Sequence, residues 1–399
     1  MLALRHPTIL VLAFLQVCAG LLEVETTLFG AFMFSLRAGP EVLGLVLGVG
    51  LGIGVVGSLF GGQLTDRVGA RVTLLGSVAL TAFGLAIEGL STAWPTAALG
   101  FLLIQGAQMA SHPAALRLIG EAASEQMGNA FGFLNTVYST VAIGGALLAG
   151  WLAQEAGWSA VFLIKAGLYL SALFLMMLFL PSPRSRPAHT LEKKEGNRGW
   201  GSLLQSTSLR CIYAAVVVNA VLGYAPSFLA YDPRLAGNPL VLARFPSISN
   251  AIWLLSNWPA GLLGDRFGRW KIVASGYALA GLAWLFFSWP RGVAPLYLLY
   301  ALYYLGDSAG SYIALLAMEC VPQEEQGRAM GLFDAFRLVG SAMGGGCGGL
   351  LWLKIGAGLR TFWLHWAWAW LVSFCSVWLL SVTPIEISLF VPIESSGWR

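Results

Sequence analysis

The sequence predicts an all-α membrane protein with twelve transmembrane helices in two pseudo-symmetric six-helix bundles. Composition is the first reason. Hydrophobic residues make up 57% of the 399 residues and charged residues only 11%, whereas soluble domains average about 45–50% and about 25%. The second reason is that one polar motif occurs twice, half a chain apart.

The repeated motif lies between two apolar runs in each half. The first copy, GQLTDRVGAR, spans 62–71, and the second, GLLGDRFGRWK, spans 261–271. Both fit G-x-x-x-D-R-x-G, and their aspartates, Asp66 and Asp265, are 199 residues apart. The segments AFGF at 130–133 and AMGL at 329–332 match at the same offset. The chain therefore consists of two copies of one unit.

Runs of suitable length set the number of predicted spans. A spanning helix needs about 20 mostly apolar residues. Such runs cover 8–34, 42–62, 71–91, 96–119, 129–153, 160–180, 210–230, 240–263, 271–289, 294–319, 329–353 and 361–383. We interpret the first as a span rather than a signal peptide, because its apolar stretch continues to Phe34.

These runs divide the chain into an N-terminal bundle at 1–180, a polar linker at 181–208, a C-terminal bundle at 209–384 and a tail at 385–399. Of the 23 Lys and Arg residues, fifteen lie on the side of the N-terminus, six on the other side and two within spans. This bias predicts a multi-pass protein of the cytoplasmic (inner) membrane with both termini cytoplasmic.

The remaining composition argues against several classes of protein. The net charge of +4 is small and not clustered, so nucleic acid is not an expected partner. The five cysteines show no C-x-x-C spacing, which gives no indication of a metal site or a disulfide framework. We expect no cofactor and no metal, and a monomer.

The duplicated motif between the second and third spans of each half, the twelve spans and the central linker resemble the major facilitator superfamily of secondary transporters. The resemblance covers essentially the whole chain. It implies two bundles around a central cavity that opens to each side in turn. It also implies a gating role for the motif residues Asp66, Arg67, Gly69, Arg71, Asp265, Arg266 and Gly268.

The chemistry of the motif suits that role. The two aspartates are expected to lie near helix N-termini, or near bases contributed by the other half, in contacts that form in one access state and break in the other. Gly69 and Gly268 are expected to adopt backbone angles that other residues avoid. The basic residues also anchor the topology.

Two signatures found in proton-coupled drug exporters of that family are absent. Such exporters often carry an arginine three residues before a Gln-Gly pair in the fourth helix, where this chain has Leu102 before Gln105-Gly106. They often carry a Gly-Pro pair in the fifth helix, where this chain has Gly144-Gly145 without a proline.

Ionisable residues inside spans are functional candidates, because burying their charge is costly. Glu23 shares a helical stripe with Gln16, Gly20, Thr27 and Gly30, and is expected to line a cavity; a structural hydrogen-bonded role is the alternative. Glu25, about 200° away on the same helix, fits either role.

The 199-residue offset pairs Gln108 with Asp307 near the middle of equivalent spans. Tyr303 shares a helical face with Asp307, and Gln105 and His112 lie on the face of Gln108. Asp307 is expected to bind a coupling proton or a substrate cation, with a purely stabilising role as the alternative. His112 relays protons or packs at the kink made by Pro113.

Three further basic residues are candidates. Lys165 in the sixth span needs an acid, water or an anionic substrate, unless it snorkels to the outer surface. Arg117 with Glu121, and Asp334 with Arg337, have the spacing of helical ion pairs, and we interpret both as gate or scaffold pairs.

Glycine runs in the second and eleventh spans indicate close helix packing, and in this architecture they would form sliding surfaces. They begin at Gly44 and Gly340. This is a packing role that would serve transport.

The predicted function is secondary active transport by alternating access. No G-x-x-x-x-G-K-[ST] motif occurs, so the energy must come from a gradient. We expect proton-coupled export of a small organic or amphiphilic solute, with uptake of a small organic anion as the alternative and a non-transporting scaffold or sensor as an alternative of another class. An enzyme is not expected. A basic cavity would favour an anion, and an acidic cavity with apolar walls would favour efflux.

Overall fold

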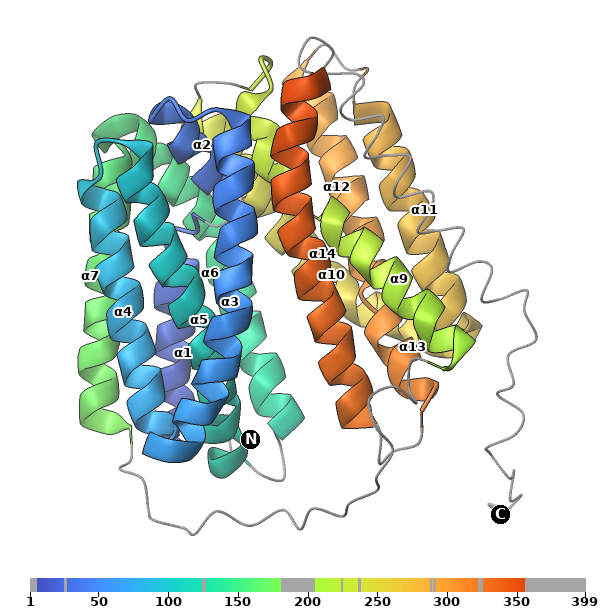
Figure 1. Cartoon of the computed structure of the whole chain (residues 1–399), viewed down its shortest axis with the longest axis horizontal. Coiled ribbons are helices and arrows are strands. Elements are labelled where there is room, and N and C mark those ends of the chain that lie inside the picture. The colour runs from blue at the N-terminus through green and yellow to red at the C-terminus, as the bar shows by residue number, and fades with distance from the viewer. Residues whose placement is uncertain are drawn as a thin grey trace.

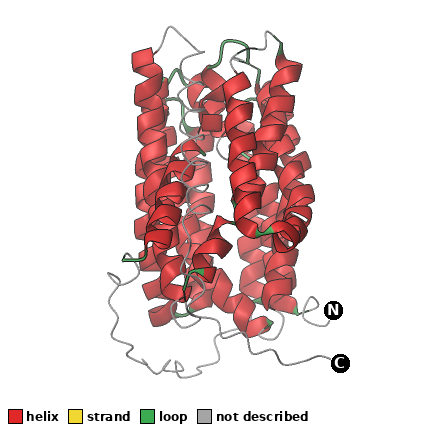
Figure 2. Ribbon diagram, turned by 90° about the vertical axis from the view of Figure 1, so that its right-hand side faces the viewer, coloured by secondary structure: helices red, strands yellow, loops and turns green. Residues whose placement is uncertain are grey.

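The computed structural model describes residues 6–24, 27–123, 127–180, 205–223, 225–235, 238–287, 289, 292–321 and 326–355. Within these ranges the chain is helical and contains no strand (Figure 2). The first half comprises α1 (Pro7–Gly20), α2 (Thr27–Ser35), α3 (Pro40–Val68), α4 (Ala70–Leu90), α5 (Trp94–Ala122), α6 (Met127–Ala156) and α7 (Trp158–Phe179).

The second half comprises α9 (Thr207–Leu222), the 3₁₀ helix η3 (Ala225–Tyr231), α10 (Pro239–Phe267), α11 (Arg269–Phe287), α12 (Val293–Gly310), α13 (Ile313–Glu319) and α14 (Gln326–Ile355). Figure 1 shows the two halves standing side by side as helical bundles. We call the end with the α3–α4 and α10–α11 turns the motif end, and the opposite end, where α2 lies, the α2 end.

Eleven of the twelve predicted spans coincide with helices of the described chain, and the predicted all-α membrane class is confirmed. The twelfth, at 361–383, lies outside the described residues, as do the tail and most of the predicted linker. Six of the described helices are long and apolar enough to cross a membrane by themselves: Pro40–Val68, Ala70–Leu90, Asn129–Ala156, Trp158–Phe179, Thr207–Tyr231 and Arg269–Phe287.

The expectation of an uninterrupted first helix is wrong. The helix ends at Gly20 and resumes at Thr27, and Leu22 has a left-handed backbone with φ of 54°. The repeat-related seventh span is interrupted at the corresponding level, between α9 and η3. Non-helical backbone is tolerated within a membrane where protein surrounds it, and Leu22, Glu23 and Val24 are all buried.

The two halves meet mainly toward the α2 end. A Cβ placed on Gly44 of α3 would lie 2.6 Å from the carbonyl oxygen of Gly345 in α14, and one on Gly48 would lie 2.9 Å from that of Ala342. The structure therefore confirms that glycines bring these two helices together. Figure 1 shows α3 and α14 converging at this end and separating toward the motif end.

Polar contacts reinforce the same junction. The Tyr231 hydroxyl of η3 donates to the carbonyl oxygen of Ala38 at 2.9 Å. Ser247 Oγ of α10 donates to the carbonyl oxygen of Ile143 in α6 at 2.7 Å. Because these contacts join the halves, the structure represents a state closed at the α2 end.

Candidate functional site

A cavity of about 210 Å³ lies between the two halves. Helices α2, α3, α4, α5 and α7 of the first half line it, and α14 of the second half contributes Arg337, Leu338 and Ser341. Its wall is mostly apolar and includes the rings of Phe29, Phe101 and Phe162. The polar lining consists of Thr81, Glu88, Gln105, Gln108, Lys165, Tyr169, Arg337 and Ser341.

A second cavity of about 510 Å³ adjoins the first. The two share the lining residues Thr81, Gln108, Met109 and Tyr169. The second cavity is lined by α1, α4, α5, α6 and α7, and its polar residues include Gln16, Ser77, Ser111, His112, Asn135 and Tyr138. Of the predicted site residues, Gln105, Gln108, His112, Lys165 and Arg337 therefore lie in one connected space.

Glu88 and Lys165 carry the buried charges of the central cavity. Glu88, near the end of α4, is 2% exposed, and Lys165, in α7, is 5% exposed. Snorkelling does not describe Lys165 here, because its side chain is enclosed by protein. No nitrogen–oxygen contact within 4.0 Å joins the two side chains in the described structure.

The sequence reasoning missed Glu88. This residue lies two positions before the end of its helix, where a carboxylate is commonly solvated at the membrane interface. A usable signal was present, since Glu88 is the only acid within the predicted run 71–91. Its burial depends on α5 and α7 covering it, which a single helix does not reveal.

Glu23 occupies the non-helical break in the first span. The residue is 3% exposed, and its Oε2 accepts a hydrogen bond from the Tyr138 hydroxyl of α6 at 2.8 Å. Tyr138 lines the second cavity and Val24 lines the first, so Glu23 is held just behind the cavity wall. The predicted helical stripe is wrong at this position, because the helix ends at Gly20 and resumes only at Thr27. Glu25 lies outside the described residues.

Asp307 is placed apart from Gln108, although the repeat makes them equivalent. It is half-buried in α12 and lines neither of the two cavities. Its surroundings are aromatic: the rings of Tyr300 and Tyr304, and those of Tyr303 and Tyr304, have centroids 4.8 Å apart. Asp307 and Tyr303 lie about one turn apart on α12 of the second half, whereas Lys165 lies in α7 of the first half.

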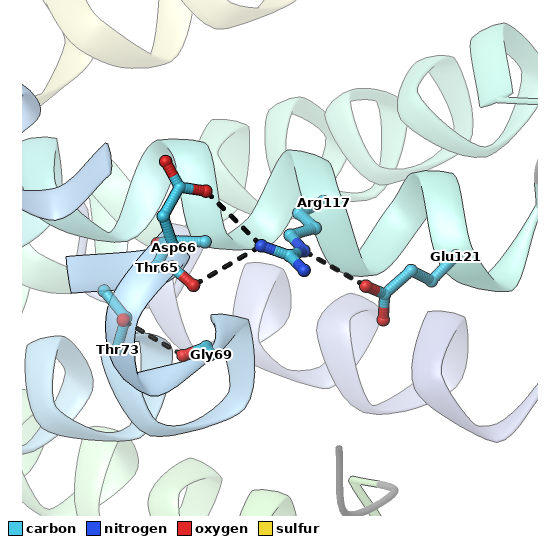
Figure 3. A network of polar contacts seen from close by, with 6 residues as sticks. All are labelled: Thr65, Asp66, Gly69, Thr73, Arg117 and Glu121. Atoms are coloured by element: carbon cyan, nitrogen blue, oxygen red, sulfur yellow. Dashed lines mark hydrogen bonds and ion pairs between the residues drawn. The ribbon is translucent and has the colours of Figure 1, made fainter. Parts of the chain in front are cut away.

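At the motif end, most of the first motif is helical rather than a loop, because α3 continues to Val68. Gly69 and Gly268 join successive helices with φ of 93° and 95°, which confirms the predicted use of glycine. Arg117 Nη1 lies 3.5 Å from Asp66 Oδ1 and 3.4 Å from the Thr65 carbonyl oxygen, and Nε lies 3.2 Å from Glu121 Oε1 (Figure 3).

The partner of Asp66 corrects the expectation of a base from the other half, since Arg117 belongs to α5 of the same half. In the second half, Arg269 at the start of α11 pairs with Glu319 at the end of α13. The side chain of Asp265 lies outside the described residues. Arg71 Nη2 donates to the Met177 carbonyl oxygen at 2.8 Å.

The other predicted gate residues are exposed. Arg67 and Arg266 lie in the last turns of α3 and α10, with their side chains largely exposed. Arg337 Nε lies 3.3 Å from Asp334 Oδ1, as the helical spacing predicted. Arg337 also reaches the central cavity, so this pair connects α14 to that cavity.

Two bundles around a shared cavity, with a duplicated motif at one end, define a membrane transporter fold. The sequence profile described as Major Facilitator Superfamily matches residues 12–345. The chain therefore belongs to this family of membrane-spanning transporters.

Named relatives are similar at low identity. The chain is 28% identical to the Multidrug resistance protein MdtG of Citrobacter koseri over 60% of this chain and 60% of that protein. It is 28% identical to MdtG of a Rahnella species over 75% of this chain and 74% of that protein. The match therefore spans less than two thirds of the Citrobacter protein.

Solved structures with this fold share little sequence. A bacterial homologue of the human lysosomal transporter Spinster, in an inward-facing and occupied conformation, superimposes with a TM-score of 0.77 at 14% identity, covering 96% of this chain and 97% of that one. The nucleoside transporter NupG gives a TM-score of 0.74 at 17% identity, covering 94% and 98%. These similarities concern the fold alone.

Proposed function

We propose that this chain exports a small organic or amphiphilic solute across the cytoplasmic membrane by alternating access, coupled to protons. The observation that carries the proposal is the central cavity, which lies between the halves and combines three phenylalanine rings with a buried acid and a buried base. Named relatives that are multidrug resistance proteins support the direction of export.

The charge of the cavity bears on the substrate. Glu88 and Lys165 have opposite charges, and Arg337 is paired with Asp334 at 3.3 Å. The lining is therefore balanced rather than strongly basic or acidic. Phe29, Phe101 and Phe162 offer rings for the apolar part of a solute, and ligand sites commonly combine such walls with a few polar groups.

Protons provide the driving force in this proposal. Glu23 and Asp307 are carboxylates within the membrane-spanning region, and protonation converts a costly buried charge into a neutral group. The hydrogen bond from Tyr138 to Glu23 links the protonation of Glu23 to a residue of the cavity wall. We assign Glu23 as the first coupling site and Asp307 as a second one in the other half.

In the proposed cycle, the α2 end and the motif end open in turn. The α3–α14 glycine contact closes the α2 end in this structure. With both termini cytoplasmic, as the distribution of Lys and Arg predicts, the motif end faces the cytoplasm and the state described here is the one that loads solute from inside. Opening at the α2 end then releases it.

Uptake of a small organic anion is the second candidate. Lys165 favours it, because a buried ammonium facing a cavity is a natural partner for a carboxylate or phosphate group. A scaffold or sensor role has less support, since the chain keeps a connected cavity and a closed junction between its halves.

The test uses the full chain reconstituted in lipid vesicles with an imposed pH gradient. A fluorescent amphiphilic cation and a radiolabelled monocarboxylate serve as the two solutes. We expect movement of the amphiphile opposite to the proton flux, abolished by Glu23→Gln or Asp307→Asn while solute exchange is partly retained. Glu155→Gln, an exposed glutamate of α6, is the control. Unchanged proton-driven accumulation in both variants would refute the coupling assignment.

A further inference from the structure

We propose that Glu88 and Lys165 form a zwitterion-binding site, in which Lys165 binds the anionic group and Glu88 the cationic group of a small solute with an aromatic or branched apolar body. This inference rests on the proposed transport function and specifies the class of solute that the central cavity takes. It assigns the role of specificity to a pair of residues on α4 and α7.

Burial without partners is the first argument. Both side chains are at least 95% buried, and both line the cavity. Within the described part of the chain, neither side chain makes a hydrogen bond or an ion pair. A buried charge without a partner is costly, so each group requires water or a ligand in the cavity.

The position of each charge is fixed by close helix packing. A Cβ placed on Gly89 of α4 would lie 2.8 Å from Leu163 Cγ of α7, and one on Gly100 of α5 would lie 2.7 Å from Glu88 Cγ. These glycines leave no space for the helices to approach further. Glu88 and Lys165 are therefore held on the closely packed helices α4 and α7, with their nitrogen and oxygen atoms more than 4.0 Å apart.

The balance of charges selects the ligand class. A simple cation bound at Glu88 would leave Lys165 unpaired, and a simple anion bound at Lys165 would leave Glu88 unpaired. Arg337 does not alter this balance, because Asp334 lies 3.3 Å from it. A zwitterion pairs both buried charges at once and places its apolar body against Phe101 and Phe162.

The size of the cavity restricts the ligand further. Its volume of about 210 Å³ is below the range of about 300–1,000 Å³ that is usual for drug-sized ligands. A molecule of the size of an amino acid suits this space. Larger amphiphiles extend into the adjoining cavity through the shared residues Gln108 and Tyr169.

The test is calorimetric titration of the full purified chain with three probes that share one aromatic body: phenylalanine, phenylpropionate and phenylethylamine. Wild type is expected to bind phenylalanine at least about tenfold more tightly than either singly charged probe. Lys165→Met should lower phenylalanine affinity about tenfold and spare phenylethylamine, and Glu88→Gln should lower it similarly and spare phenylpropionate.

Retained binding of the singly charged probe shows that each variant is folded. The doubly exchanged variant, Glu88→Lys with Lys165→Glu, keeps both charges and should recover the preference for phenylalanine. Lys271→Met and Glu155→Gln, both exposed, are the matched controls. The inference would be overturned if wild type did not bind phenylalanine or did not prefer it to the singly charged probes. It would also be overturned if both single variants kept that preference. Proton-driven movement of the fluorescent amphiphile in that same preparation would show that the proposed transport function survives.

Discussion

Gly44→Ala tests how the α2 end is held closed. The added methyl group would lie 2.6 Å from the Gly345 carbonyl oxygen and 2.8 Å from Gly349 Cα. A relaxed carbon–oxygen contact is about 3.3–3.6 Å, so α14 must withdraw by about 0.7–1 Å. Both obstructing groups are backbone and cannot turn aside as a flexible side chain would.

The energetic effect follows from comparing two conformers of the same chain. Replacing glycine by alanine favours the helix by about 1 kcal/mol, but it does so in both conformers, so this gain does not change their ratio. Overpacking of about 1–3 kcal/mol affects only the conformer closed at the α2 end. We therefore expect the ratio of open to closed conformers to rise about 5-fold to 150-fold.

The assay is the distance between spin labels on Leu90 and Trp289, measured in a background without the native cysteines. These side chains are 72% and 64% exposed and lie at the α2 end of the two halves. Gly44→Ala should add a longer distance. Gly52→Ala is the matched control on the same helix, because its new methyl group meets nothing within 4 Å. Identical distance distributions for the two variants would refute the reasoning.

Three further predictions concern single side chains. Tyr138→Phe removes the donor to Glu23 and should slow proton-driven transport about tenfold; an unchanged rate in vesicles would contradict the coupling role. Asp232→Ala removes a fully buried carboxylate lying 2.5 Å from Arg234, and should lower the free energy of unfolding by about 3–5 kcal/mol, measured by denaturant unfolding in detergent. Arg117→Gln removes exposed contacts, so stability should change by less than about 1 kcal/mol while the transport rate falls; a large loss of stability would show that Arg117 is mainly structural.

Local rules made part of this structure predictable. Chain length per span and the 199-residue repeat gave the positions of the helices. The positive φ at Gly69 and Gly268 follows from the backbone freedom of glycine in a tight turn. The contact between α3 and α14 follows from their glycines, because close approach of two helices requires small residues at the contact.

Other features depend on how neighbouring helices are rotated and packed. Glu88 is buried only because α5 and α7 cover the end of α4. The carboxylate of Glu23 accepts a hydrogen bond from Tyr138, which is 115 residues away in sequence. Gln108 lines the central cavity, but its repeat equivalent Asp307 does not, because the two halves differ in their local packing.

The pairing of Asp66 illustrates the same limit. A base near the motif was expected, but the sequence does not say which helix supplies it. In the structure Arg117 of α5 does so, through a contact with a side chain at the end of α3 (Figure 3). In the second half, Arg269 and Glu319 form an ion pair at the same end of the molecule, at positions that the 199-residue offset does not match to Asp66 and Arg117.

Alternating access is the central claim, and the most direct measurement is the side from which a cysteine at Gln108 reacts with a membrane-impermeant maleimide. Gln108 lines both connected cavities. In vesicles of known orientation, the cysteine should react with maleimide added on the side of the motif end. When Gly44→Ala is added, the rate of reaction from the α2 end should rise and the rate from the motif end should fall. Reaction from the same single side in both backgrounds, or equal reaction from both sides in each, would contradict alternating access.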